Sequence, residues 1–101
     1  MLDKVTQETF APLVGRQFHL YIDPVQAVDV ELISAVGLQP HARKGEAPRR
    51  EPFSLVFRGP RDFLVPQRIY ALEQEVLGTL EIFLVPIGPD EIGQRYQAVF
   101  N

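Results

Sequence analysis

The sequence predicts a mainly β domain, a small antiparallel six-stranded barrel or barrel-like meander with one short N-terminal helix. Apolar and polar residues alternate in six segments, which is the two-residue period of a strand, and glycines and prolines separate these segments. The chain has 101 residues, of which 46% are hydrophobic, so it can form one core and we expect a single domain over residues 1–101. A two-sheet β-sandwich is the alternative.

Residues 6–15 predict the short helix. Thr6 is a suitable N-cap residue and Gly15 a suitable stop. Pro12 limits the segment to one or two turns, because proline removes a backbone donor and clashes with the preceding turn.

The first predicted hairpin covers residues 16–32. Its two strands flank a turn at Asp23 and Pro24, residue types that favour turns. The side chains expected on the inward face are Phe18, Leu20, Ile22, Val28, Val30 and Leu32.

Residues 37–52 predict a long, flexible, basic loop, because they are rich in glycine and proline and hold little large apolar material. The loop lacks aromatic residues that could stack on bases, and the net charge of the chain is −3, so nucleic acid is not an expected partner. Four basic residues could instead contact an acidic protein partner: Arg43, Lys44, Arg49 and Arg50.

The remaining strands are predicted at residues 53–58, 67–73, 79–86 and 94–100. The third of these is apolar on both faces, because Phe83 and Val85 alternate with Leu80, Ile82 and Leu84.

In a closed barrel we expect the N-terminal segment to cover Phe83 and Val85; in an open one, another subunit would cover them. Both residues are therefore candidate partner contacts. The covering side chains of the N-terminal segment would be Leu2, Val5, Phe10 and Leu13.

Motifs for catalysis or metal binding are missing from the sequence. It contains no cysteine, its two histidines (His19 and His41) have no metal-ligand spacing, and neither Ser34 nor Ser54 lies in a nucleophile turn. Glycines do not form a phosphate-binding loop. The acidic pairs 29/31 and 73/75 are expected to be solvated charges on strand faces. We therefore expect neither an enzyme nor a bound cofactor.

Cytoplasmic localisation and no membrane partner are the expectation. The N-terminus lacks the apolar run of a signal peptide, and no stretch approaches the roughly 18 apolar residues of a membrane-spanning helix.

Three segments carry a resemblance: residues 50–60 (REPFSLVFRGP), 83–89 (FLVPIGP) and 96–101 (YQAVFN). With these motifs the chain resembles a family of bacterial proteins of about this length that is known as a domain of unknown function. The resemblance extends over essentially the whole chain and includes residues 6–10 and 66–70. The resemblance implies that the protein is encoded near phage-tail-collar-like proteins, and therefore that it has a structural or assembly role. It implies no catalytic residue.

Our leading hypothesis is a non-enzymatic structural or protein-interaction module that pairs with another chain or with itself. The alternative is a small-ligand-binding barrel with Tyr21, Tyr70, Tyr96 and His19 around a cup. An enzyme would require polar groups that converge from distant strands, which a sequence pattern does not reveal.

Overall fold

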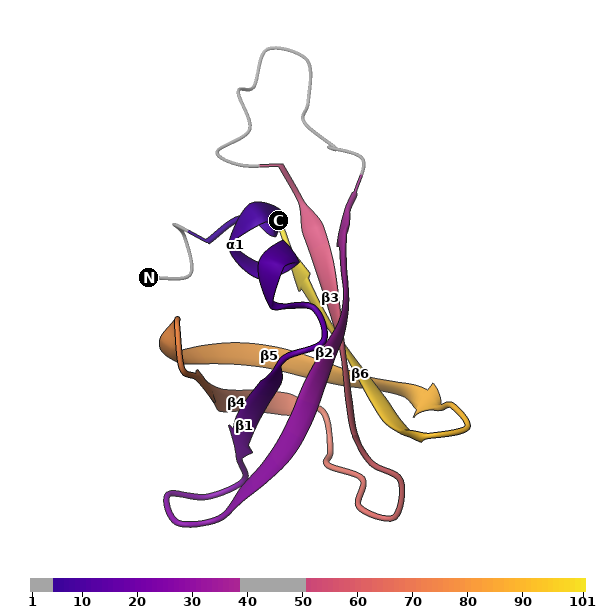
Figure 1. Ribbon diagram of the computed structural model, residues 1–101. Coiled ribbons are helices and arrows are strands. Elements are labelled where there is room, and N and C mark those ends of the chain that lie inside the picture. The colour runs from indigo at the N-terminus through magenta and orange to yellow at the C-terminus, as the bar shows by residue number, and fades with distance from the viewer. Residues whose placement is uncertain (1–4, 39–50) are drawn as a thin grey trace.

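A closed antiparallel barrel forms the body of the protein (Figure 1), as described by a computed structural model over residues 5–38 and 51–101. A short helical segment precedes the six strands of these residues, which confirms the predicted class and favours the barrel over the sandwich. The elements are α1 (Gln7–Phe10), the 3₁₀ turn η2 (Ala11–Leu13), β1 (Gln17–Tyr21), β2 (Ala27–Gly37), β3 (Phe53–Pro60), β4 (Arg68–Gln74), β5 (Gly78–Pro89) and β6 (Gly93–Phe100).

Two three-stranded meanders make up the barrel, because the strands follow the order β1-β2-β3-β6-β5-β4 and β4 pairs with β1. The barrel is therefore not one continuous meander, since β3 lies beside β6 and not beside β4, and β4 pairs with β5 as a hairpin. β3 instead pairs with β6 along its whole length, from Phe53 opposite Phe100 to Pro60 opposite Gly93.

β3 and β6 approach each other closely at the start of β6. A Cβ atom on Gly93 would lie 2.0 Å from the carbonyl oxygen of Gly59, so only glycine permits this approach. The connection at residues 61–67 has its own anchor, because buried Val65 donates its backbone N–H to the hydroxyl of Tyr96 at 3.0 Å. The connection at residues 61–67 is long enough for β4 to lie elsewhere than beside β3.

The barrel interior is packed with inward-facing side chains. Aromatic rings fill the end near the C-terminus, where the ring centroids of Phe53 and Phe100 are 4.6 Å apart and that of Phe10 lies 5.9 Å from each. Deeper in the barrel Phe18 meets Phe57 edge-on at 5.1 Å. Such offset and edge-on contacts are the favoured arrangements of aromatic rings and add to the free energy gained by burial.

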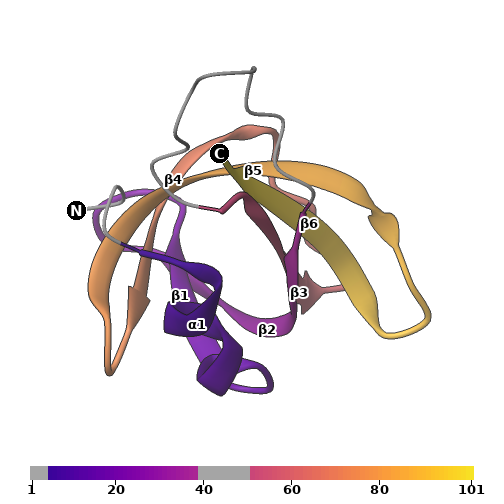
Figure 2. The ribbon, with the colours of Figure 1, turned by 90° about the horizontal axis from the view of Figure 1, so that it is seen from above.

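The N-terminal segment closes the end of the barrel that lies towards the upper parts of β2, β3 and β6 (Figures 1 and 2). The backbone N–H of Thr6 donates to Thr9 Oγ1 at 3.0 Å, and the Gln7 amide donates to the carbonyl of Ala35 on β2 at 3.1 Å. Gly15 ends the segment at φ +91°, which glycine adopts without strain. The predicted helix and its stop are thus confirmed.

The predicted cover of Phe83 by this segment is wrong. Phe10 is fully buried against Phe53 and Phe100, whereas Phe83 stays 48% exposed on the outer face of β5. The reason is that β5 pairs with β6 only from Val85 onward, so the aromatic ends of β3 and β6 extend beyond β5 and need the apolar lid. Leu2 lies outside the described residues.

The predicted loop at residues 37–52 lies mostly outside the described residues, and so do Arg43, Lys44, Arg49 and Arg50. Its ends belong to the sheet, because β2 reaches Gly37 and the Leu38 N–H donates to the Pro52 carbonyl at 2.8 Å.

Candidate functional site

The four side chains proposed for a ligand cup do not converge, so that site is not formed. Tyr70 and Tyr96 are buried, and their hydroxyls bond the backbone at Pro66 and Val65. Burial raises the pKa of Tyr70. Tyr21 and His19 instead point out from β1, because they alternate with the inward-facing Phe18 and Leu20.

The outer face of β2, β1, β4 and β5 carries a row of polar cross-strand pairs. His19 lies opposite Asp29 on β2 and Glu73 on β4, and its Nδ1 is 2.7 Å from an Asp29 carboxylate oxygen. The Tyr21 hydroxyl donates to Glu73 at 3.0 Å, and this hydrogen bond to a carboxylate raises the pKa of Tyr21. His19 is thus an exposed residue of the sheet face, as expected.

Negative charge predominates on this outer face. Of the outward positions on β1, β4, β5 and the first half of β2, none is lysine or arginine. Four are carboxylates: Asp29, Glu31, Glu73 and Glu81. We call this surface the acidic face.

An apolar pair lies at one border of the acidic face. Ile69 on β4 is directly opposite Phe83 on β5, and the two side chains are 58% and 48% exposed. Val85 follows Phe83 on the same side of β5 and is half-buried opposite Gln97. Two of the six partner-contact residues predicted from the sequence therefore lie side by side on the surface, with Ile69 as a neighbour that the pattern did not single out.

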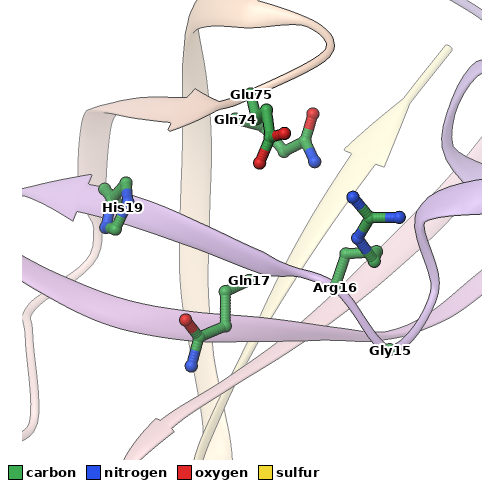
Figure 3. A pocket seen from close by; sticks show the side chains of 6 residues that line it. All are labelled: Gly15, Arg16, Gln17, His19, Gln74 and Glu75. Atoms are coloured by element: carbon green, nitrogen blue, oxygen red, sulfur yellow. The ribbon is translucent and has the colours of Figure 1, made fainter.

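A polar hollow of about 360 Å³ lies where β1 and β4 separate (Figure 3). The two strands pair only from His19 to Tyr21, so their ends beyond this ladder diverge. The residues that line the hollow are Gly15, Arg16, Gln17, His19, Gln74 and Glu75. Sequence reasoning missed this site, because the β1–β4 contact joins segments more than 50 residues apart.

Gln74 is the most constrained residue of the hollow. Gln74 is only 3% exposed, and its Oε1 accepts hydrogen bonds from the backbone N–H groups of Val76 at 2.6 Å and Leu77 at 3.2 Å. Among the described residues, every fully buried side-chain nitrogen or oxygen has a hydrogen-bond partner. The Gln74 Nε2 has no acceptor among these residues, so it is not fully buried. Its NH₂ group is therefore accessible from the hollow.

Arg16 and Glu75 line opposite sides of the hollow (Figure 3). Their side chains form no hydrogen bond or ion pair with any residue that the structure describes.

A second polar cluster lies at the other end of the barrel, at the β5–β6 turn. One Asp90 carboxylate oxygen accepts from the N–H groups of Ile92 and Gly93, and the other accepts from Arg58 at 3.0 Å. The bonds from Gly93 and Ile92, together with Arg58, lower the pKa of Asp90 from 3.8 to about 2. Arg61 donates to the carbonyls of residues 90 and 91. These groups form hydrogen bonds with one another and stabilise the turn.

A metal-binding cluster and a membrane-spanning helix are both absent from the described residues. No three histidine, cysteine, aspartate or glutamate side chains gather there in a way that could hold a metal ion. The helices of these residues are too short to cross a bilayer.

The motif segments 50–60 and 83–89 meet at the β5–β6 turn, because Pro60 and Pro89 both lie beside the start of β6. The profile of a protein family matches residues 5–100, nearly the whole chain. The chain belongs to the family described as domain of unknown function DUF6916. This confirms the resemblance, and the family description assigns no activity. No curated protein and no solved structure matches the chain.

Proposed function

We propose that this DUF6916 domain is a non-enzymatic protein-interaction module that binds another protein chain on the outer face of β1, β4 and β5. The observation that carries this proposal is the exposed cross-strand pair of Ile69 and Phe83. Large apolar side chains gathered on a surface are typical of interaction sites, and an aromatic residue at their centre supplies much of the binding free energy.

The charge around this pair favours a partner of definite chemistry. Glu81 precedes Phe83 on the same side of β5, and Glu73 lies beyond Ala71 on β4. Complementary charge raises the association rate and selects among partners. We therefore expect the partner to present apolar side chains flanked by lysine or arginine.

Self-association, which the sequence left open, fits this surface less well. A two-fold contact centred on Phe83 would place the same surface patch on both sides of the interface. Both sides of the interface would then carry the Glu73 and Glu81 carboxylates, and this like charge disfavours the contact. The charge distribution thus favours a different chain.

The non-enzymatic part of the proposal rests on how the titratable groups are placed. The His19–Asp29 pair lies on the open outer face, and among the described residues no serine forms a hydrogen bond with it. Ser34 and Ser54 belong to β2 and β3, on the β3 side of the barrel. An assembly role, such as the resemblance implies, would be one setting for such a module.

Two matched peptides test the partner chemistry. One alternates phenylalanine or isoleucine with lysine, and the other carries glutamate in place of every lysine. We expect saturable binding of the basic peptide by fluorescence anisotropy, with NMR shifts that map to β4 and β5. We expect the acidic peptide to bind at least about tenfold more weakly at low salt, and the difference to shrink as salt screens the charges.

A double variant tests the site. Ile69→Thr with Phe83→Thr removes the apolar pair and keeps residues that favour strands. The matched control is Val25→Thr, which removes an apolar side chain that is 88% exposed in the β1–β2 turn. The proposal requires the double variant to lose peptide binding and the control to keep it. Equal binding by both variants, or equal binding of both peptides, would overturn it.

A further inference from the structure

The polar hollow offers a second binding site, with chemistry different from that of the apolar pair. We infer that it binds a small zwitterion, a molecule with one carboxylate and one ammonium group. Three groups around the hollow carry the inference: the Arg16 guanidinium, the Gln74 NH₂ group and the Glu75 carboxylate. None of them has a partner among the described residues, although each can form strong hydrogen bonds.

Arg16 and Gln74 supply the donors that would hold the carboxylate. Figure 3 shows the nitrogen of the Gln74 amide on the side that faces Arg16. Both groups are donors, and a guanidinium binds a carboxylate through two parallel hydrogen bonds. The Gln74 amide is already oriented, because its oxygen is held by the N–H groups of Val76 and Leu77. A ligand therefore binds to it with little loss of side-chain entropy.

Glu75 supplies the acceptor that would hold the ammonium group. It follows Gln74 directly, and its carboxylate lines the same hollow. A simple anion would be attracted by Arg16 and repelled by Glu75, and a simple cation would meet the reverse. A zwitterion aligned with the two charges gains from both, so the pair selects for it.

The size of the hollow indicates a small ligand. Its volume of about 360 Å³ is near the lower limit of ligand pockets, which measure roughly 300–1,000 Å³. Gln17 and His19 complete the lining and add further polar groups. The inference is independent of the proposed protein interaction, since it concerns other residues and another class of ligand.

The first test is an NMR titration of the isotope-labelled full chain with a length series of zwitterions: glycine, β-alanine, 4-aminobutanoate and 6-aminohexanoate. Butanoate and butylammonium are the controls that carry one charge only. We expect saturable shifts at Arg16, Gln17 and the Gln74 side-chain amide for at least one zwitterion. Each control should bind at least about tenfold more weakly, since it lacks one charge-assisted interaction.

The second test uses near-isosteric variants whose fold is checked by the dispersion of the same spectra. Gln74→Glu keeps an oxygen for the turn and removes the NH₂ donor, while Arg16→Gln and Glu75→Gln each remove one charge. Each should weaken zwitterion binding at least about tenfold. Glu91→Gln, an exposed charge change at the opposite end of the barrel, is the matched control and should leave binding unchanged.

Three results would overturn the inference: no zwitterion of any length shifts the hollow residues, butanoate binds as tightly as the zwitterions, or the three variants bind like the wild type.

Discussion

The two polar clusters at opposite ends of the barrel differ in how their charges are used. At the β5–β6 turn, Asp90 accepts hydrogen bonds from two backbone N–H groups and from Arg58, and Arg61 holds two carbonyls. At the hollow between β1 and β4, Arg16 and Glu75 have no partner among the described residues. The first cluster is built to hold the chain, and the second leaves its charges available.

This difference separates stability from function. A polar group that is saturated by its own chain has little left for a ligand, and its removal exposes unpaired partners. A charged group that the fold leaves unpaired contributes little to the free energy of unfolding, so its substitution should affect binding alone. The exposed apolar pair of Ile69 and Phe83 resembles the unpaired charges in this respect, because its substitution should also affect binding more than the free energy of unfolding.

The largest effect is expected at the saturated end, from Gly93→Ala. The added Cβ would lie 2.0 Å from the Gly59 carbonyl oxygen, so β3 and β6 must move apart. We expect a loss of about 3 kcal/mol in the free energy of unfolding, measured by urea denaturation. The control is Gly37→Ala, whose Cβ would meet only the movable end of Gln7 at 3.3 Å. Equal losses in the two variants would contradict the close strand contact.

Asp90→Asn should have the next effect and should depend on pH. Because the pKa of Asp90 is about 2 in the folded chain and 3.8 ordinarily, its stabilisation is complete above the ordinary value. This stabilisation is lost as the pH falls through the folded-state pKa of about 2. We expect the urea midpoint of the wild type to fall from about pH 5 to about pH 2 more steeply than that of the variant. Parallel pH profiles would show that the turn does not depend on this carboxylate.

A smaller loss is expected for Tyr96→Phe. The substitution keeps the buried ring and removes the hydroxyl that accepts the Val65 N–H at 3.0 Å. An unpaired buried N–H costs about 1–2 kcal/mol. The residues 61–67 should then exchange their amide protons faster, which hydrogen exchange measures. Unchanged exchange there would show that Val65 is not anchored through this bond.

The smallest effect is expected at the hollow. Arg16→Gln and Glu75→Gln should each change the free energy of unfolding by less than about 0.5 kcal/mol, because both side chains are exposed and unpaired among the described residues. Urea denaturation at neutral pH checks this. A loss comparable to that of Tyr96→Phe would place these charges among the residues that hold the fold.

The strands and the short helix could be predicted from the sequence, since alternation and local stop signals act over a few residues. The pairing of β3 with β6 could not, because it joins segments that lie far apart in the sequence. The same limit applies to surfaces: alternation identified Phe83 and Val85 as the second face of β5 but not what lies over them. The hollow was also beyond the sequence, because it arises where the β1–β4 ladder ends.

One comparison tests most directly the claim that the unpaired groups serve binding and the paired ones serve the fold. It measures the urea midpoint of a fourfold variant, Arg16→Gln, Ile69→Thr, Glu75→Gln and Phe83→Thr, beside that of Asp90→Asn at neutral pH. We predict that the fourfold variant keeps a midpoint close to that of the wild type while it loses peptide and zwitterion binding, and that Asp90→Asn shows the reverse. A fourfold variant less stable than Asp90→Asn would contradict the claim.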